Sequence, residues 1–266
     1  MIEVADDRDN DWLGRRVAAE TYFSVCERCE QCRAGRRNLC PTRRSIGSFE
    51  DGGFAESIVV PVSNLHALPI RLGDALDGVL AEPLACVTHS LLATGVIRPG
   101  ERVLVTGPGA MGQLAAQVAM VSGAEVLLAG LDTDAPRLAV AASLGIGTTT
   151  TAAVEAESFD VVVECSGSAA AANAALQAVR RAGRYLQVGI FASPVTIDFN
   201  TVLYKELQVS SGFASTPTSW RRAMELIGQG RLSLAPLITS RFALADFPLA
   251  FDLVLRGEGI KTVLVP

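Results

Sequence analysis

The chain has 266 residues, 49% of them apolar and 19% charged, which is enough apolar sequence to bury a sizeable core in one large or two ordinary domains. Its net charge of −5 and isoelectric point near 5.2 disfavour tight binding to nucleic acid or to an anionic membrane. Met1–Asn10 carries four acids and neither the basic nor the apolar region of a secretory signal. We expect a cytoplasmic protein with a small-molecule ligand.

Residues 1–68 are polar and irregular, with short strand-like runs at Arg16–Glu20 and Glu56–Val60. Leu80–Gly95 follows, where apolar residues recur at helical spacing before the turn Arg98–Gly100. The sequence therefore predicts a helix that leads into the next domain.

From Arg102 the chain alternates between strand and helix patterns. The predicted elements are Val103–Thr106, Met111–Ser122, Glu125–Ala129, Pro136–Leu144, Phe159–Glu164, Ala169–Arg181 and Arg184–Val188. Continuously apolar strands alternating with helices are typical of a doubly wound parallel sheet, which gives an α/β fold.

Val103–Ala124 lacks charge, but its glycines and Pro108 divide it into strand, turn and helix, so we predict a buried βα unit and no membrane span. After Ser210 we expect a helix at Thr218–Gln229. Two short apolar runs, Pro236–Ile238 and Lys261–Val265, then close the chain without restarting the pattern.

Four cysteines within fifteen residues point to a metal site: Cys26, Cys29, Cys32 and Cys40. Four thiolates surround one Zn²⁺ tetrahedrally and leave no position open for substrate, so this zinc would be structural. Six arginines nearby suggest a nucleic-acid zinc module instead. We give that alternative little weight, because no aromatic residue lies between Cys26 and Cys40 to stack on bases.

A glycine-rich loop follows the first strand of the alternating region and opens its first helix. It matches G-x-G-x-x-G and consists of Gly107, Pro108, Gly109, Ala110, Met111 and Gly112. In that context the loop predicts a dinucleotide site, with the pyrophosphate at the helix N-terminus.

The cofactor could be NAD or NADP. Asp132 lies twenty residues beyond Gly112, where an acidic residue would meet the adenosine ribose, but the predicted strand Glu125–Ala129 brings Gly130 to that position, two residues before Asp132. Arg137 could either cover the adenine or meet a 2′-phosphate. The residues favour NAD only modestly.

Several motifs in order make the chain resemble the zinc-containing medium-chain dehydrogenase/reductase family, in its polyol (sorbitol-type) and threonine dehydrogenase branch. Besides the cysteine run and the glycine loop, they are Gly14–Val17, Asn38–Cys40, Asp51–Glu56, Glu82–Leu84, Tyr204–Leu207 and Gly259–Lys261. The resemblance implies a mainly-β GroES-like catalytic domain with a zinc lobe at 1–83, a Rossmann domain at 84–225 and a return to the catalytic domain at 226–266.

The resemblance implies hydride transfer between NAD(P) and a secondary alcohol of a polyol, sugar or amino-alcohol, with a catalytic zinc polarising the alcohol. By motif, Glu82 is a ligand or near-ligand of that zinc; alternatively, its carboxylate complements the helix dipole. The implied cofactor contacts beyond the glycine loop are Cys165, Ser166, Gly167, Val188, Gly189, Ser211, Gly212 and Phe213.

The family's cysteine and histidine segments for the catalytic zinc are not found in this sequence, which suggests a GroES-like domain truncated at its N-terminus. His89 could share a helix face with Glu82, but we expect a packed residue there and at Cys86. A catalytically silent dinucleotide-binding remnant is therefore an alternative, and a start site placed too far downstream would be a simple explanation. The resemblance also implies a homodimer or homotetramer formed through Leu207–Ser210.

Overall fold

The computed structural model describes residues 1, 3–70 and 72–266. Its centre is a six-stranded, wholly parallel sheet in the order β10-β9-β8-β5-β6-β7. The strands are β5 (Arg102–Thr106), β6 (Glu125–Gly130), β7 (Gly147–Thr150), β8 (Phe159–Glu164), β9 (Val179–Gln187) and β10 (Gln208–Ser211). The chain moves outward from β5 in one direction and then, after β7, returns to β8 on the other side. The predicted doubly wound sheet is confirmed.

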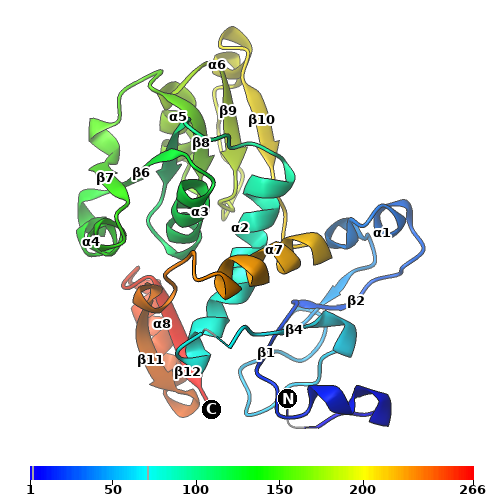
Figure 1. Ribbon diagram of the computed structural model, residues 1–266. Coiled ribbons are helices and arrows are strands. Elements are labelled where there is room, and N and C mark those ends of the chain that lie inside the picture. Colours follow the sequence, from blue (N-terminus) through cyan, green and yellow to red (C-terminus); the bar gives the residue numbers. More distant parts are fainter. Residues whose placement is uncertain (2, 71) are drawn as a thin grey trace.

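Helices cover this sheet on both faces (Figure 1). They are α3 (Ala110–Val121), α4 (Ala135–Ser143), α5 (Ala169–Ala178) and α6 (Phe199–Tyr204). We predicted that the helix after β8 would reach Arg181, but it stops at Ala178. Val179 pairs with Phe159 and already belongs to β9, so a sheet contact ends the helix.

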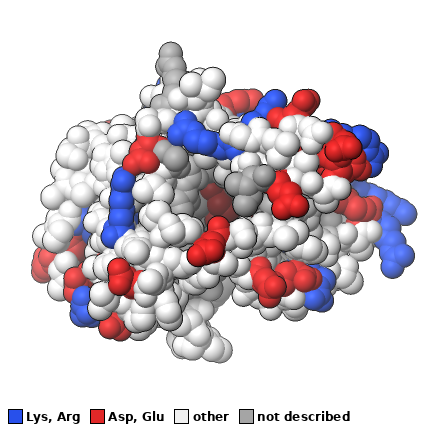
Figure 2. All heavy atoms as spheres, turned by 90° about the horizontal axis from the view of Figure 1, so that it is seen from below, with Lys and Arg blue, Asp and Glu red and all other residues white. Residues whose placement is uncertain are grey.

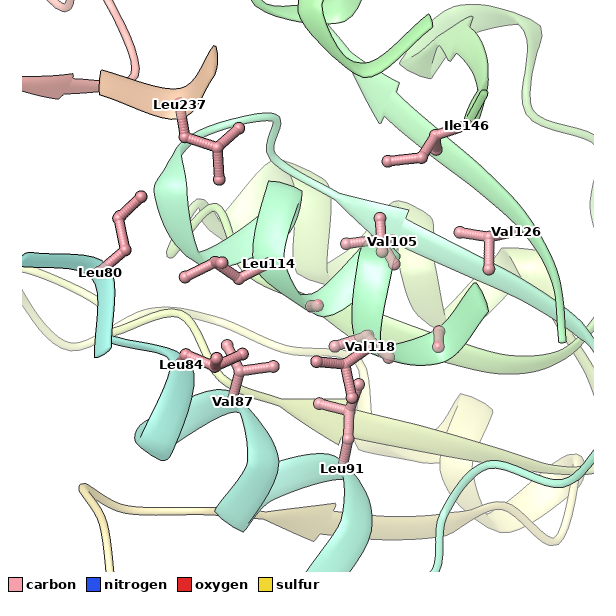
Figure 3. Packing of buried hydrophobic residues seen from close by; sticks show 14 of the residues in the cluster. Leu80, Leu84, Val87, Leu91, Val105, Leu114, Val118, Val126, Ile146 and Leu237 are labelled. Carbon is pink, nitrogen blue, oxygen red and sulfur yellow. The ribbon is translucent and has the colours of Figure 1, made fainter. Parts of the chain in front are cut away.

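The main core lies between α2 (Ala81–Thr88), which continues as a π-helical turn η5 (His89–Ala93), and α3. Leu84, Val87 and Leu91 point from this helix toward Leu114 and Val118 of α3 (Figure 3). All five side chains are fully buried, so the predicted helix ties the N-terminal residues to the sheet domain.

Within the described residues, one helical stretch, Leu76–Ala93, is long and apolar enough to cross a membrane by length and composition alone. More than half of it, 56%, is buried inside the fold. This is the core helix of Figure 3.

The N-terminal residues form a lobe of short elements beside the sheet domain (Figure 1). Its elements are η1 (Asp7–Trp12), β1 (Val17–Ala19), β2 (Tyr22–Ser24), α1 (Glu30–Arg33), η2 (Arg37–Leu39), β3 (Arg44–Ser45), η3 (Val62–Asn64), β4 (Leu65–Ala67) and η4 (Ala75–Leu80). The predicted strand at Arg16–Glu20 is β1, which pairs with β4. The prediction of a strand at Glu56–Val60 is wrong: the segment is largely exposed and pairs with no strand in the described part of the chain.

The expectation that the alternating pattern does not restart after Ser210 is also wrong. After α7 (Pro217–Gly228) and η8 (Ala235–Leu237), β11 (Ile238–Ala243) pairs in parallel with β12 (Lys261–Val265). Between them lie η9 (Leu244–Asp246) and α8 (Phe247–Leu255), so the tail is a further βαβ unit. It touches the N-terminal lobe through an Arg241–Asp74 ion pair of 2.9 Å.

Lys205, in the motif Tyr204–Leu207, has a structural role. Its buried ammonium donates to the carbonyl oxygens of Leu176, Gln177 and Val179 at 2.8–3.1 Å, where α5 ends and β9 begins. Burial lowers the pKa of Lys205, while the nearby Glu157 carboxylate opposes that shift. The lysine thus satisfies carbonyls that a helix C-terminus leaves without partners.

Replacing Lys205 by Met should lower the free energy of unfolding by about 2 kcal/mol, because three carbonyls at this buried junction lose a donor and only the Gln177 carbonyl keeps the Glu157 N–H as well. Lys261→Met is the matched control, since the Lys261 side chain has no hydrogen bond to the described residues. Urea denaturation measures both. Equal losses for the two variants would contradict this role.

Candidate functional site: a four-cysteine metal centre beside a dinucleotide-binding edge

The four clustered cysteines are preformed for one metal ion. Their Sγ atoms all lie within 4.8 Å of one another, with Cys26–Cys40 at 3.6 Å and Cys26–Cys32 at 4.0 Å. Four sulfurs 2.3 Å from a tetrahedral zinc are about 3.8 Å apart, so the cluster fits that ion. No other group of three His, Cys, Asp or Glu side chains with such spacing occurs in the described ranges.

Backbone groups prepare these sulfurs for metal binding. The N–H of Cys29 donates to Cys26 Sγ at 3.3 Å, and the N–H of Cys32 donates to Cys29 Sγ at 3.4 Å. Backbone N–H groups of Arg28 and Cys29 lower the pKa of Cys26 to about 6. A thiolate is the metal-binding form of cysteine, so the backbone favours the ligand state at Cys26. Burial instead raises the pKa of Cys32 to about 12.

The glycine loop has the geometry that a pyrophosphate needs. A Cβ on Gly112 would lie 1.9 Å from the Gly107 carbonyl oxygen, and one on Gly107 would lie 2.8 Å from Ser166. A Cβ on Gly109 would meet nothing within 4 Å. Two of the glycines therefore permit close packing, while the third leaves open space in front of the α3 N-terminus, which has no side-chain cap.

Glu164 connects the two loops that follow β8 and β9. Its fully buried carboxylate accepts hydrogen bonds from the N–H of Ser166 at 2.7 Å and of Gly167 at 3.1 Å, and from the Gln187 amide at 2.7 Å. Its backbone carbonyl accepts from the N–H groups of Val188 and Gly189, both at 2.8 Å. The predicted residues Cys165–Gly167 and Val188–Gly189 are thus brought together at the carboxyl edge of the sheet.

Sequence analysis did not single out Glu164. The available signal was a carboxylate that ends the otherwise apolar strand Phe159–Glu164. Burial and the Glu164 charge raise the pKa of the neighbouring Cys165, so that thiol stays protonated.

The end of β6 explains the missing acidic residue. A Cβ on Gly130 would lie 2.9 Å from the ring of Pro108, so the glycine loop itself crowds this position. Asp132 is exposed beyond it in η6 (Asp132–Asp134). The Arg137 guanidinium bonds Asp134 at 3.0 Å, the Gly259 carbonyl oxygen at 2.7 Å and the Gly257 carbonyl, so its present contacts hold the C-terminal segment.

The segment Ser211–Thr216 runs between β10 and α7 and touches both the zinc lobe and α2. Asn38 donates to the Phe213 carbonyl oxygen at 2.8 Å, and the Tyr22 hydroxyl donates to the Ser215 carbonyl oxygen at 2.7 Å. A Cβ on Gly212 would lie 2.5 Å from Ser90 Cα, so this segment also packs closely on η5.

Glu82 lies in the first turn of α2, where its carboxylate accepts a hydrogen bond from the Cys86 thiol at 3.4 Å. Burial and the Glu82 charge raise the pKa of Cys86, which keeps the thiol protonated. The two form no metal site with a third ligand among the described residues. The structure thus supplies the four-cysteine site but not a ligand set for a catalytic zinc.

Neither histidine joins Glu82. His66 bonds the buried Glu20 carboxylate at 3.0 Å and stacks on Trp220 with ring centroids 4.3 Å apart. His89 lies 3.5 Å from the Asn38 amide nitrogen, and burial lowers its pKa. Both are packed residues.

The charged side chains on the face seen in Figure 2 are scattered in small groups of both signs. That face carries no broad basic patch for a nucleic-acid backbone.

Comparison with known proteins now identifies the family. Residues 110–229 match the zinc-binding dehydrogenase domain, and residues 1–70 match the alcohol dehydrogenase GroES-like domain. The chain is 35% identical to a sorbitol dehydrogenase of Halalkalibacterium halodurans, an alignment that covers 100% of this chain and 80% of the relative.

This chain belongs to the zinc-containing medium-chain, alcohol dehydrogenase-like family. A D-arabitol-phosphate dehydrogenase of Enterococcus avium is 30% identical over 99% of this chain and 78% of its own length. A zinc-binding dehydrogenase from Sinorhizobium meliloti, solved with NADP bound, has 30% identity and a TM-score of 0.84 over 96% of this chain and 77% of its own.

Family membership makes the chain an NAD(P)-dependent oxidoreductase of small-molecule alcohols. The predictions of the family, of the Rossmann and GroES-like folds, and of zinc and a nicotinamide cofactor are confirmed.

Purified protein should contain one zinc per chain, and Cys29→Ser should abolish it, because three thiolates leave one position of the tetrahedron open. Cys86→Ser is the control and should keep the metal. Elemental analysis after gel filtration measures both variants. Zinc retained by Cys29→Ser, or lost by Cys86→Ser, would contradict the four-cysteine assignment.

Proposed function

We propose that this chain transfers hydride between NAD(P) and a secondary alcohol of a polyol, sugar or amino-alcohol in the cytoplasm. The observation that carries the proposal is the open space in front of Gly109, between packed glycines and at the point where the strand order reverses. Ligands of open α/β sheets bind at such switch points. The named activities of the relatives support the substrate class.

The residues of the glycine loop, Gly107–Gly112, would hold the pyrophosphate with backbone N–H groups. Cys165–Gly167 and Val188–Gly189 would line the cofactor from the neighbouring strand ends, with Glu164 fixing both loops. Ser211–Phe213 would face the nicotinamide, which accepts or donates the hydride.

The adenosine end of the site lacks the carboxylate contact that would favour NAD. Because Pro108 crowds Gly130, no carboxylate side chain ends β6 to bond a ribose 2′-hydroxyl. Asp132 lies two residues further on and is exposed. Arg137 could reach a 2′-phosphate only by leaving the Gly257 and Gly259 carbonyls.

A specific observation favours a second candidate, a catalytically silent dinucleotide-binding protein. Glu82 and Cys86 lack a third metal ligand among the described residues, so these side chains do not make up a site for a catalytic zinc. Glu82 would then complement the positive end of the α2 dipole.

An activity assay separates the two candidates. Zinc-loaded protein is mixed with NAD⁺ or NADP⁺ and a panel of polyols, polyol phosphates and amino-alcohols, and absorbance at the reduced-nicotinamide band is followed. An active enzyme produces reduced cofactor with at least one of these alcohols. Reduced-cofactor binding without turnover of any alcohol would establish the silent protein.

Substituting two glycines of the glycine loop gives a more specific test of the cofactor site. Gly109→Val should leave the free energy of unfolding within about 0.5 kcal/mol but weaken NAD(P)H binding at least about tenfold, because the new side chain fills the pyrophosphate space. Gly112→Ala should instead lower the stability by about 2 kcal/mol or more, since its Cβ collides with the Gly107 carbonyl. Unchanged NAD(P)H affinity in Gly109→Val would contradict the site.

Homodimers or homotetramers would form through β10, the exposed edge strand of the sheet. Val209 on this strand is 45% exposed, and the nearby α6 exposes Phe199, Leu203 and Tyr204. An unpaired edge beside an apolar surface favours pairing with a second copy.

A further inference from the structure

We propose that the zinc lobe positions the segment Ser211–Thr216, and with it the nicotinamide, through the side-chain amide of Asn38. The inference rests on the proposed function, because it says which residues hold the proposed nicotinamide-binding segment in place. Asn38 is a positioning residue here: it acts through the backbone of Phe213.

The contact is direct and buried. Asn38 is 4% exposed, and its Nδ2 donates to the Phe213 carbonyl oxygen at 2.8 Å. A carbonyl oxygen only accepts, so the amide nitrogen, and not the amide oxygen, must face it. No other residue of the described chain donates to this carbonyl.

The segment needs such a restraint because its backbone is strained. Ala214 has a φ of +57°, in the left-handed region that residues with a Cβ rarely adopt. Its two neighbours are pinned from the lobe: Phe213 by Asn38 and Ser215 by the Tyr22 hydroxyl. Releasing Phe213 would let Ala214 relax and move the segment.

The other end of the contact leads to the four-cysteine site. Asn38 is the middle residue of the short turn η2, which ends at the ligand Cys40; the Cys40 N–H donates to the Arg37 carbonyl at 3.1 Å. Between Cys26 and Cys40 the regular elements are η2 and a four-residue helix. Elements this short do not hold a loop by themselves, so an ion bound by the four cysteines would cross-link the loop and fix Asn38.

A second contact follows the same path. The Arg43 guanidinium, three residues beyond Cys40, lies 5.1 Å from the Tyr22 ring centroid and 5.0 Å from that of Phe213. It bridges the lobe and the segment through two aromatic faces. The lobe therefore contacts both the backbone and the side chain of Phe213.

The test compares ligands with and without the nicotinamide. Asn38→Asp keeps the size of the side chain but cannot donate to the carbonyl, and Asn38→Ala removes the group. Both should weaken NAD(P)H binding about three- to tenfold, the range for one lost hydrogen bond, while the affinity for ADP-ribose or its 2′-phosphate changes less than about twofold. Arg36→Ala, an exposed position on the same lobe, is the control and should change neither.

Zinc removal gives a second test, which needs no variant. Chelation should reproduce the selective loss of NAD(P)H affinity, and added zinc should restore it. Titration by cofactor fluorescence or calorimetry, with the zinc content of each sample measured, gives all values.

Unchanged NAD(P)H affinity in both Asn38 variants, or an equal loss for NAD(P)H and ADP-ribose in zinc-loaded samples, would overturn the inference. If the unmodified protein binds neither ligand, the proposed function itself fails. If it binds both but shows no selective effect, only the role of Asn38 fails.

Discussion

The open space at the carboxyl edge of the sheet depends on one close contact, between the loop after β5 and the loop after β8. Gly107 and Ser166 approach so closely that a Cβ on Gly107 would collide with Ser166. The Glu164 carboxylate holds the loop after β8 by accepting the Ser166 N–H. Because these contacts fix both loops without using Gly109, the space in front of Gly109 stays open. A buried carboxylate is costly unless it is fully hydrogen-bonded, and here five donors from the chain meet its side chain.

The four-cysteine lobe and the dinucleotide-binding edge meet at one segment, Ser211–Thr216. Four thiolates around one zinc would leave no position open for substrate, and the lobe that carries them contributes Asn38, Tyr22 and Arg43 to the residues after β10. The segment is also packed on Ser90 of η5. Three parts of the chain that are far apart in sequence thus define where the nicotinamide end of a cofactor would lie.

The sequence predicted what depends on local spacing. The cysteine run and the glycine loop each lie within fifteen residues, and the apolar strands need only their own composition. Contacts between distant residues escaped prediction: the pairing of Val179 with Phe159 shortens α5, and Glu56–Val60 has strand-like residues but no partner strand in the described chain. The roles of Glu164 and Asn38 were likewise hidden, because their partners come from other strands and loops.

The most direct measurement is a crystal structure of the zinc-loaded chain with NAD(P)H. Our account predicts the pyrophosphate against the N–H groups that follow Gly109, with the nicotinamide beside Ser211–Phe213 and the Asn38–Phe213 hydrogen bond retained. A cofactor bound elsewhere, or a glycine loop that stays empty while NAD(P)H binds in solution, would contradict it.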